Sequence, residues 1–343
     1  MKCNRCGLEV PYPKIRNNES EYSQCYYCDM HDTIESDRFD FDKYLRKLRR
    51  TKNKYHCVIG ISGGMDSSIL VYMSIRYWRI NPLVVHFDNG YNTEVAKHNM
   101  SMLKKQLNFD MIVYSMSQKA YDDVNRSFIL AGVPDADIAN DMAMSYYINF
   151  TAEKYGIKSI FNGHNYRTEG TSPVNWSYMD AKYIKSVSGS VNFPYLTMKD
   201  QIRQSIKGIK QIRPFYYQSE EWLERIKYRL IKSGLKTYPC KHGENHYTLF
   251  VGAYYLPARF GIDKRLTYRA ARKRSGIEVE KDKKVAIDFD KLPFSRSYIN
   301  GLRKKEIDRS SYSRYNFKKY RLLFWVLMKL NYFSRTFYEK YCK

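Results

Sequence analysis

The sequence predicts an α/β protein with a Rossmann-like parallel sheet, because short apolar strands alternate with amphipathic helices from Tyr55 to about residue 170. This alternation is typical of a parallel sheet that helices cover on both faces. Strands are predicted at 55–62, 82–88, 110–116 and 157–163. Helices are predicted at 67–78, 93–107 and 135–156, the last of which ends at Gly156.

With 343 residues, the chain is long enough for one main domain with appendages. We expect a cysteine-bearing head at 1–35, the α/β domain at 36–235, and a mainly helical region at 236–343 that contacts substrate or a partner. Further helices are predicted at 35–50, 180–187, 219–234 and 264–274.

The chain is strongly basic, with a formal net charge of +24. Such a charge suits a nucleic acid, an anionic membrane surface or a nucleotide-linked substrate, and a basic surface without such a partner is the alternative. The first residues lack the pattern of a signal peptide, and no run of about 18 apolar residues could span a membrane. We therefore expect a cytoplasmic protein whose seven cysteines are reduced, which favours metal binding over disulfides.

Four cysteines form two C-x2-C pairs, Cys3 with Cys6 and Cys25 with Cys28. This is the arrangement of a zinc ribbon, in which four thiolates close a tetrahedral metal site. Because four thiolates leave no open coordination position, a zinc ion here is expected to be structural. The alternatives are an iron–sulfur cluster, which thiolates also bind, and four unrelated cysteines.

The stretch S-G-G-M-D-S-S at 62–68 lies between the first predicted strand and its helix. Its glycines let the backbone approach a phosphate closely, and the helix N-terminus presents free N–H groups to an anion. The stretch lacks the G-K-[ST] of a Walker A loop and the spacing of the dinucleotide-binding G-x-G-x-x-G. A glycine turn without function is the alternative, but the added serines and aspartate make the pattern far more specific.

This loop resembles the pyrophosphate loop (PP-loop) of the ATP-pyrophosphatase superfamily, which includes GMP, NAD and asparagine synthetases and tRNA-thiolating enzymes. The resemblance covers the α/β domain and implies that ATP is cleaved between its α- and β-phosphates, with AMP transferred to a carbonyl oxygen. It implies that Asp66 acts in catalysis beside a magnesium ion. The residues implied to hold pyrophosphate are Ser62, Gly63, Gly64, Asp66, Ser67 and Ser68.

The ends of two further strands carry residues that the same resemblance assigns. Asp88, Asn89 and Gly90 follow the second strand, where members of the superfamily contact adenosine. Gly163 and His164 follow the fourth strand and face the same crevice, outside the carboxyl edge of the sheet. Gly163 is assigned to nucleotide binding and His164 to catalysis.

Together with the cysteine head, the stretches at 88–94, 240–248 and 254–265 resemble the N-acetyl sugar amidotransferases of surface-glycan biosynthesis, over residues 1 to about 275. Members are linked to lipopolysaccharide O-antigen and flagellin-glycan pathways. The resemblance implies that ATP and Mg²⁺ serve to adenylate the acetamido oxygen of an N-acetylated sugar, and that ammonia then displaces AMP to give an acetamidino group. It also implies that a separate glutaminase with an ammonia-channel subunit supplies the ammonia.

Cys240 and His242 belong to the stretch PCKHGENH and are candidate catalytic residues. A second metal site and a purely structural role are the alternatives. Asp137 and Asp141 open the helix predicted at 135–156. They are either ordinary acids at a helix N-terminus or ligands of magnesium.

The loop at 171–183 offers Trp176, Tyr178 and Asp180 for stacking on a sugar or a base, with a place in the core as the alternative. Near the C-terminus, a basic and aromatic tail has four apolar residues at helical spacing, which are Leu323, Val326, Leu327 and Leu330. This pattern fits a helix packed on the domain, which base rates favour, and also a helix lying on the inner membrane face.

Two other function classes share some of these features. A tRNA-modifying enzyme of the thiolation or lysidine type has the same loop, often has zinc knuckles, and explains the positive charge. Thiolation, however, needs catalytic cysteines, and Cys57 and Cys240 are poorly placed for it. The other class is a nucleic-acid-binding module in which the loop has lost its catalytic role. Such a module does not need both serines and the aspartate of the S-G-G-M-D-S-S loop, so we do not expect a nucleic-acid partner.

Overall fold

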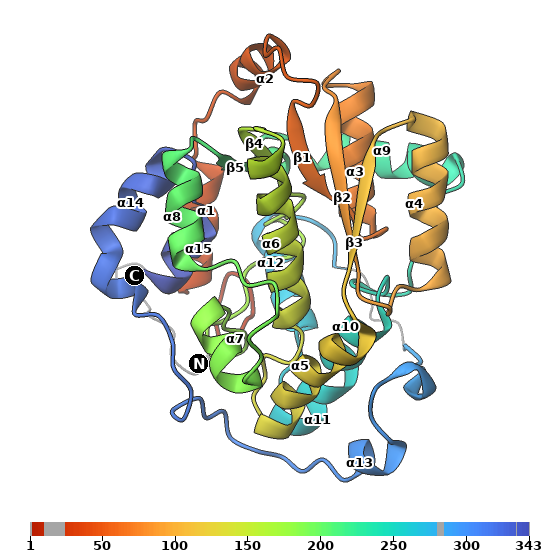
Figure 1. Ribbon diagram of the computed structural model, residues 1–343, viewed down its shortest axis with the longest axis vertical. Helices are drawn as coiled ribbons and strands as arrows, with labels where there is room; N and C mark the ends of the chain where they lie inside the picture. The colour runs from red at the N-terminus through yellow and green to blue at the C-terminus, as the bar shows by residue number, and fades with distance from the viewer. Residues whose placement is uncertain (1, 10–24, 280–284, 334, 343) are drawn as a thin grey trace.

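The computed structural model describes residues 2–9, 25–279, 285–333 and 335–342. At its centre is a parallel sheet of five strands in the order β3-β2-β1-β4-β5 (Figure 1). The strands are β1 (Cys57–Gly60), β2 (Pro82–Asp88), β3 (Met111–Ser115), β4 (Ser159–Phe161) and β5 (Lys210–Ile212). The predicted fold class and all four predicted strands are therefore confirmed.

Helices cover both faces of the sheet (Figure 1). On one face, Val58 and Ile160 pack beside Ala152 of α6 (Ile138–Lys154). On the other face, Ile59 and Phe161 belong to a larger apolar cluster, because successive strand residues point to opposite faces. The helices of this second face are α2 (Phe41–Arg49), α3 (Met65–Arg76), α4 (Glu94–Leu107) and α9 (Glu220–Lys232).

Most predicted helices are present with small shifts at their ends. Those predicted at 67–78, 93–107, 135–156, 180–187, 219–234 and 264–274 correspond to α3, α4, α6, α7 (Ala181–Ser188), α9 and α12 (Arg265–Arg274). The continuous helix predicted at 35–50 is wrong, since α1 (Tyr26–Glu35) ends where it was expected to begin. The chain restarts at Asp40, whose carboxylate caps α2 by accepting a hydrogen bond from the Lys43 N–H at 2.8 Å.

Between β1 and β5, two helices have no counterpart in the prediction, and neither has β5 itself. The helix α5 (Gln118–Ala131) buries Tyr121, Val124 and Phe128, which are at helical spacing. The helix α8 (Met198–Ile206) begins with a capping box between Thr197 and Asp200. The strand β5 has only three residues and no apolar run, so it depends on its pairing with β4.

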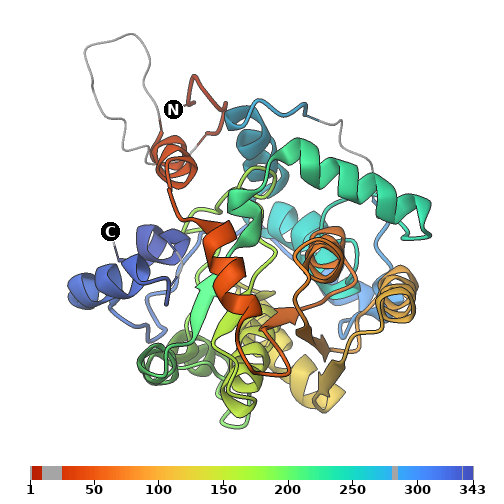
Figure 2. The same ribbon diagram turned by 90° about the horizontal axis from the view of Figure 1, so that it is seen from above.

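The C-terminal region is mainly helical, as predicted. Its remaining helices are α10 (His246–Phe250), α11 (Leu256–Phe260), α13 (Arg296–Asn300), α14 (Arg321–Lys329) and α15 (Arg335–Tyr341). Figure 2, seen from above, places the last two helices at one side of the molecule. There the backbone N–H of Gln211 in β5 donates to the Asn331 carbonyl at 2.8 Å, which ties the tail to the edge of the sheet.

The packing expected for the tail is wrong for three of its four apolar residues. In α14 the buried side chains are those of Phe324 and Met328. Leu323, Val326 and Leu330 are exposed. The apolar face singled out from the sequence is therefore the face that does not pack on the domain.

The cysteine head lies against the end of α12. Cys25 is the N-cap of α1, so the second cysteine pair lies at the start of a helix. An isolated antiparallel bridge between Lys2 and Glu9 closes the turn that contains the first pair. Residues 10–24 of the predicted head lie outside the described residues.

Candidate active site

The stretch at 62–68 forms a turn between β1 and α3, at the carboxyl edge of the sheet. Here β1 lies between β2 and β4, and this reversal of strand order is the place where open parallel sheets bind ligands. Gly64 is the N-cap of α3, and no described side chain caps that helix, so its first N–H groups are open to an anion. Gly63 has a φ of +77°, and a Cβ there would lie 2.4 Å from the Ala96 carbonyl oxygen. Only glycine fits at that position.

The three serines of the loop differ in what they can contact. The hydroxyls of Ser62 and Ser67 lie 3.3 Å apart at the turn. The N–H of Gly64 donates to the Ser62 hydroxyl at 3.2 Å. Ser68 is fully buried, and its hydroxyl has no hydrogen-bond partner among the described residues. We therefore expect hydroxyl contacts to phosphate from Ser62 and Ser67, and none from the Ser68 side chain.

A lysine and two carboxylates meet beside this loop. The Lys241 Nζ lies 3.3 Å from the Asp66 Oδ2 and 3.1 Å from the Glu169 Oε1. Burial raises the pKa of Asp66, and the Lys241 ammonium partly opposes this effect. Burial lowers the pKa of Lys241, but the two carboxylates outweigh it and leave the lysine charged. Three segments far apart in the sequence thus bring alternating charges to one point.

The segment from Tyr238 to Glu244 covers the loop. The Tyr238 hydroxyl donates to the Gly63 carbonyl at 2.8 Å, and the Glu244 Oε1 lies 3.5 Å from the Ser62 hydroxyl. Burial, together with Asp66 and Glu169, raises the pKa of Glu244 to about 7. An acid with this pKa and this position can carry or release a proton beside the phosphate loop.

His164 lies at the carboxyl end of β4, as predicted, but its ring is held on both sides. Its Nδ1 lies 3.1 Å from the Tyr216 hydroxyl, and its Nε2 lies 3.1 Å from the Gly170 carbonyl oxygen. Burial and the nearby Arg213 lower the pKa of His164 to about 3, so the ring is neutral. These bonds orient the loop that carries Glu169. Gly163 lies against the backbone of Asp66, so a Cβ there would be 3.5 Å from the Asp66 carbonyl.

Cys240 and His242 flank Lys241 without forming a pair. Burial and Glu244 raise the pKa of Cys240, which keeps it a thiol near neutral pH. Burial lowers the pKa of His242 to about 3, and its ring packs against Tyr268 with centroids 5.8 Å apart. His242 has a φ of +62°, a strained backbone for a residue with a side chain. The turn that aims Lys241 at the two carboxylates depends on this backbone.

The residues predicted to contact adenosine form a turn after β2. The Asp88 Oδ1 accepts hydrogen bonds from the Gly90 N–H and the Asn92 amide, both at 3.0 Å. Asn89 is buried, and its amide donates to Asn140 at 2.8 Å and accepts from Asn245 at 3.0 Å. The side chain of Asn89 therefore holds the Glu244 segment in place. Adenosine contact through this turn remains a prediction.

Asp137 and Asp141 lie at the start of α6, near the same crevice. Asp137 is the N-cap, but its carboxylate does not cap the helix and accepts instead from the Thr248 hydroxyl at 3.0 Å. Burial and Asp141 raise the pKa of Asp137 to about 7. Lys264 and Glu244 also act on the pKa of Asp137, which places it near the covering segment. Both acids therefore lie at a helix N-terminus, as one of the two alternatives states, although the Asp137 carboxylate does not cap the helix, and magnesium binding stays a prediction.

The residues proposed for stacking belong to the core, which was the stated alternative. Tyr178 is buried, and its hydroxyl donates to the Asp180 carboxylate at 2.6 Å. Asp180 caps α7 by accepting from the Tyr183 N–H at 2.6 Å. Trp176 packs on the same apolar cluster. Stacking by Tyr178 is thus wrong, because its ring has no free face.

The site fits ATP with a magnesium ion. The uncapped start of α3 and the hydroxyls of Ser62 and Ser67 suit phosphate oxygens. The carboxylates of Asp66 and Glu169 are hard oxygen ligands of the kind that Mg²⁺ shares with phosphates. In this structure the Lys241 ammonium lies between them. Bound magnesium would neutralise the charge of the departing pyrophosphate.

The four head cysteines have the geometry that one metal ion requires. All four are buried, and their sulfurs lie within 4.8 Å of one another. The Sγ–Sγ distances are 3.8 Å for Cys3–Cys28, 3.8 Å for Cys6–Cys25 and 3.6 Å for Cys25–Cys28. One tetrahedral ion with metal–sulfur bonds of about 2.3 Å requires sulfur–sulfur edges of about 3.8 Å. An iron–sulfur cluster fits less well, because its cysteines bind different iron atoms and lie further apart.

The metal site is linked to the active-site loop. Arg274, at the end of α12, donates to the Cys28 and Cys6 sulfurs at 3.4 and 3.3 Å. From the same head, Glu35 of α1 accepts from Arg167 at 3.3 Å and from the Tyr166 hydroxyl. The head therefore braces the loop at 164–170 that supplies Glu169.

We expect the purified protein to contain about one zinc ion per chain, since four thiolates form a closed tetrahedral site. Cys25→Ser should lose the metal and expose the head to proteolysis, as metal-analysis spectrometry and limited digestion would show. Cys240→Ser is the matched control and should keep the metal. Stoichiometric iron with the visible absorption of an iron–sulfur cluster would contradict the expectation.

Glu169 and Lys241 are the residues that the sequence interpretation missed. Neither lies in the phosphate loop, and their partnership with Asp66 arises only when β4 and the 236–245 segment fold over α3. A weak signal was available, since Lys241 lies between the candidates Cys240 and His242.

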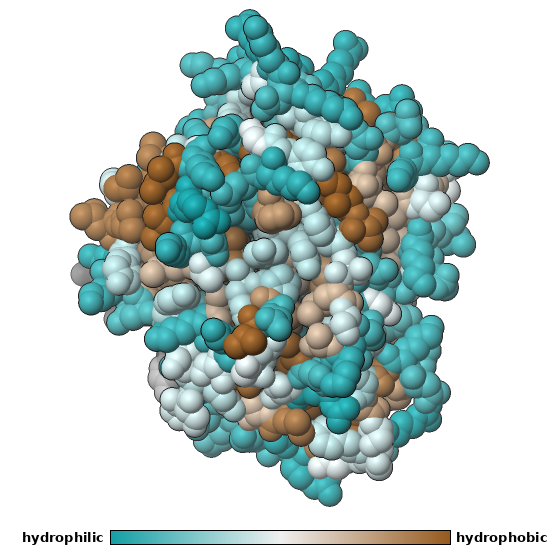
Figure 3. Space-filling view, in the orientation of Figure 1, coloured by the Kyte–Doolittle hydropathy of each residue, from teal (hydrophilic) through white to brown (hydrophobic). Residues whose placement is uncertain are grey.

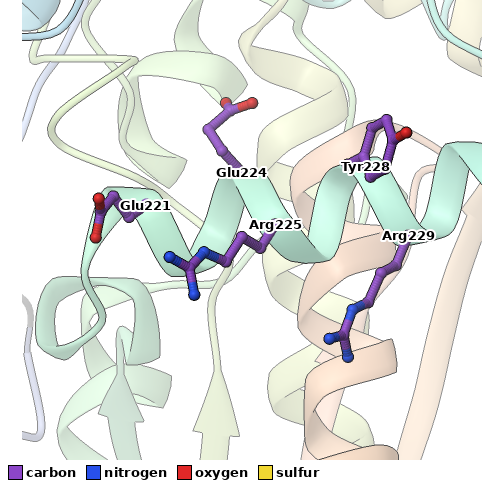
Figure 4. A pocket seen from close by; sticks show the side chains of 5 residues that line it. All are labelled: Glu221, Glu224, Arg225, Tyr228 and Arg229. Carbon is purple, nitrogen blue, oxygen red and sulfur yellow. The ribbon is translucent and has the colours of Figure 1, made fainter.

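A surface hollow on α9 lies apart from this site. The five side chains that line it all come from that one helix, and Glu224 and Arg225 point to different sides of it (Figure 4). Arg229 donates to the Tyr77 hydroxyl at 2.5 Å, and Glu224 pairs with Lys227. The hollow is the outer surface of a packed helix.

No protein-family model matches the chain. A curated relative, "Uncharacterized protein MJ1599" of Methanocaldococcus jannaschii, is 26% identical over 168 residues. The match spans 48% of this chain and 59% of that protein, so the chain covers little more than half of the relative's length.

Solved structures with similar chains include two kinds of enzyme. The U34-tRNA thiolase NcsA of Methanococcus maripaludis, with its [4Fe-4S] cluster, is 14% identical with a TM-score of 0.36, and the match covers 88% of this chain and 96% of that one. The NH3-dependent NAD synthetase of Campylobacter jejuni is 9% identical with a TM-score of 0.26, over 60% and 94% of the two chains. The NMN synthetase of Francisella tularensis is 16% identical with a TM-score of 0.28, over 60% and 99%. The nucleotide interpretation rests on the loop and its surroundings, not on these similarities.

Proposed function

We propose that the protein is an ATP-dependent, AMP- and pyrophosphate-forming amidotransferase. Its proposed substrate is an N-acetylated, nucleotide-linked sugar that serves as a precursor of surface glycans. The proposed use of ATP is supported above all by the S-G-G-M-D-S-S turn at the uncapped start of α3. This turn lies beside the group formed by Asp66, Lys241 and Glu169. The sugar is supported by the resemblance of the residues at 88–94, 240–248 and 254–265 to sugar amidotransferases.

In the first step, the acetamido oxygen attacks the α-phosphorus of ATP, and the bond to the departing pyrophosphate breaks. The N–H groups at the start of α3 and the hydroxyls of Ser62 and Ser67 hold that pyrophosphate. Lys241 and the two carboxylates orient the phosphates. In the second step, ammonia adds to the imidate carbon, the carbon–oxygen bond to AMP breaks, and two protons leave the nitrogen and return to solvent. The acetamido oxygen therefore ends in AMP.

We expect the ammonia to come from a separate glutaminase, and free ammonium to replace it in vitro. The test incubates the protein with ATP, Mg²⁺, ammonium and nucleotide-linked diacetamido sugars labelled with ¹⁸O in the acetamido group. We expect equal amounts of AMP and pyrophosphate, ¹⁸O in the AMP, and a product in which NH has replaced oxygen. AMP release without transfer of ¹⁸O would overturn the proposed acceptor atom.

A tRNA-modifying activity is the second candidate, and the net charge of +24 favours it. Thiolation is disfavoured, because burial raises the pKa of both Cys57 and Cys240 and keeps them as thiols. The same assay distinguishes the two functions. AMP release that requires tRNA and ignores the sugar would favour the second candidate.

A further inference from the structure

A hollow of about 200 Å³ lies between α6, α8, β5 and the last helices, in the region between α6 and α15 in Figure 1. It has room for six or seven water molecules at about 30 Å³ each, which is the size of one ring with its substituents. Neither the loop nor the charged group at Lys241 lines it. The hollow is thus a separate feature with its own chemistry.

Five side-chain amides are among the polar groups that line the hollow. Gln204 is 5% exposed, and no hydrogen bond engages its side chain within the described residues. Gln211 donates to the Asn149 oxygen at 3.1 Å, which leaves its own carbonyl oxygen for a ligand. The amide atoms of Gln204 are not sealed from solvent, so a ligand in the hollow can bond them in place of water. The two amides therefore suit a ligand with hydrogen-bonding groups.

The one carboxylate in the wall is already satisfied. Asp180 accepts from the Tyr178 hydroxyl and from the N–H groups of Tyr183 and Tyr315. The remaining wall is aromatic, with Phe317, Phe333, Phe337 and Tyr341 from the C-terminal tail. Amides beside aromatic faces suit a neutral ring with polar edges and an apolar face.

The hollow adjoins the active site at one end. Asn162 lines it, and the Asn162 oxygen accepts from the His164 N–H at 2.8 Å. Arg213 also lines it and donates to the Tyr216 hydroxyl at 3.3 Å, which in turn lies 3.1 Å from His164. Two lining residues of the hollow thus connect it through hydrogen bonds to His164, at the start of the loop that carries Glu169.

The geometry points to this hollow as the acceptor subsite, which holds one neutral pyranose ring that carries an acetamido group. The assignment of the hollow to the acceptor of the reaction rests on the proposed function. The prediction that a sugar ring binds in the hollow does not depend on that function. The amides of Gln204 and Gln211 bond the ring substituents, and the tail aromatics pack on its apolar face. The tail thereby becomes part of the substrate site.

The test measures binding of methyl N-acetylglucosaminide and of uridine by ligand-observed NMR, without ATP. We expect the glycoside to bind and Gln204→Met, which has nearly the same shape, to weaken it about tenfold. Gln106→Met on α4 is the matched control and should bind as wild type does. ATP affinity should be unchanged in both variants.

A second variant keeps the test decisive if the Gln204→Met protein misfolds. Ser145→Leu, on the half-buried face of α6, fills the hollow and should abolish glycoside binding with an unchanged melting temperature. Glycoside binding that neither variant weakens would overturn the subsite, and so would uridine binding that depends on Gln204. If the glycoside binds as expected but no AMP forms with any sugar, the subsite stands and the proposed reaction fails.

A different observation concerns the outer face of α14. Leu322 is 76% exposed, Trp325 44% and Leu330 50%. With Leu323 and Val326 they form one contiguous apolar face, which we call the α14 face. Figure 3 shows hydrophobic side chains gathered on the side of the molecule where Figure 1 places this helix. An exposed cluster of this kind marks an interaction surface.

The charged residues in the chain segment that forms the α14 face have one sign. Lys318, Lys319, Arg321 and Lys329 are all exposed, and the sequence has no Asp or Glu from residue 309 to 338. The Lys329 Nζ lies 5.9 Å from the centre of the Trp325 ring. No described helix has the length and hydropathy to cross a bilayer. A short apolar face with a basic rim is instead typical of a helix that lies in the surface of an anionic membrane.

We infer that the α14 face docks on an anionic lipid surface, with its leucines and Trp325 in the interface and its lysines at the headgroups. The inference does not depend on the proposed reaction. Leu322→Ser/Leu330→Ser should lower partition into phosphatidylglycerol-rich vesicles about a hundredfold or more, because both leucines lose the burial of their apolar surface in the interface. Ile206→Ser/Val191→Ser is the matched control, since these two apolar residues are also strongly exposed but lie elsewhere.

Three readouts decide this inference. Trp325 fluorescence should shift to the blue with anionic vesicles, and Trp325→Phe should lose that shift. Binding should fall with added salt and be weak on pure phosphatidylcholine. Equal binding to both lipids, or no binding to either, would overturn it. A concentration-dependent dimer that the leucine variant abolishes would also overturn it and assign the face to a second copy of the chain.

Discussion

Asp66→Ala should lower the rate of AMP formation by a factor on the order of 10²–10³, the loss seen when one preorganised electrostatic group is removed from an active site. Asp66 is the one loop carboxylate that contacts Lys241, at 3.3 Å, and it lies where magnesium and the departing pyrophosphate would meet. Its removal leaves Lys241 paired with Glu169 alone. The measurement is the steady-state release of AMP and pyrophosphate.

The fold should survive this substitution. Asp66 lies in the first turn of α3, where its favourable interaction with the helix dipole is worth about 0.3–1 kcal/mol. Asp42→Ala is the matched control, since Asp42 is an exposed acid in the first turn of α2. The control should keep full activity and a similar melting temperature. An Asp66→Ala protein with nearly wild-type turnover would refute the role of Asp66 at the metal and phosphates.

The sequence predicts most of the sheet well, because the residues of these strands are themselves typical of buried strands. The segments at 55–62 and 82–88 are mainly apolar, which favours strands of a sheet that is covered on both faces. By contrast, β5 consists of Lys210, Gln211 and Ile212, and it becomes a strand only through pairing with β4. Such a strand cannot be predicted from its own residues, because its formation depends on the residues of the neighbouring strand.

The candidate site also has one part that the sequence predicts and one part that it does not. The phosphate loop is one continuous stretch, so its glycines and serines are visible as a motif. The group formed by Asp66, Glu169 and Lys241 is assembled from three distant segments. Ser68 and Tyr178 show the opposite case, because their side chains have plausible chemistry in the sequence and are buried in the structure. Burial is a property of the whole fold, and no spacing in the sequence reveals it.

The tail shows why its role could not be predicted. Residues 301–316 run over the surface with little regular structure. They are fixed to the domain by Arg309, whose Nε and Nη2 donate to the Asp135 carboxylate at 2.6 and 3.0 Å. Arg309 also donates to the Asn175 carbonyl at 2.9 Å. A single arginine within a basic stretch gives no sign of such a buried partner.

Arg309→Ala should destabilise the protein by about 3–5 kcal/mol, because it leaves a buried charge without its partner. The Asp135 side chain is completely buried and that of Arg309 is 7% exposed. Asp135 would keep only the Tyr178 N–H and the Tyr183 hydroxyl as donors. The free energy of unfolding in urea measures the effect.

Three further variants distinguish the loss of the charge pair from the loss of packing. Arg309→Lys keeps the charge but not the two parallel hydrogen bonds, so it should fall between wild type and Arg309→Ala. Arg296→Ala breaks the exposed pair with Asp290, whose side chains are 65% and 77% exposed, and should cost less than about 1 kcal/mol. Asp135→Asn combined with Arg309→Ala should recover part of the loss, because the buried charge is then gone. If the double variant is no more stable than Arg309→Ala, the tail is held by its aromatic packing, and the ion pair contributes only to its position.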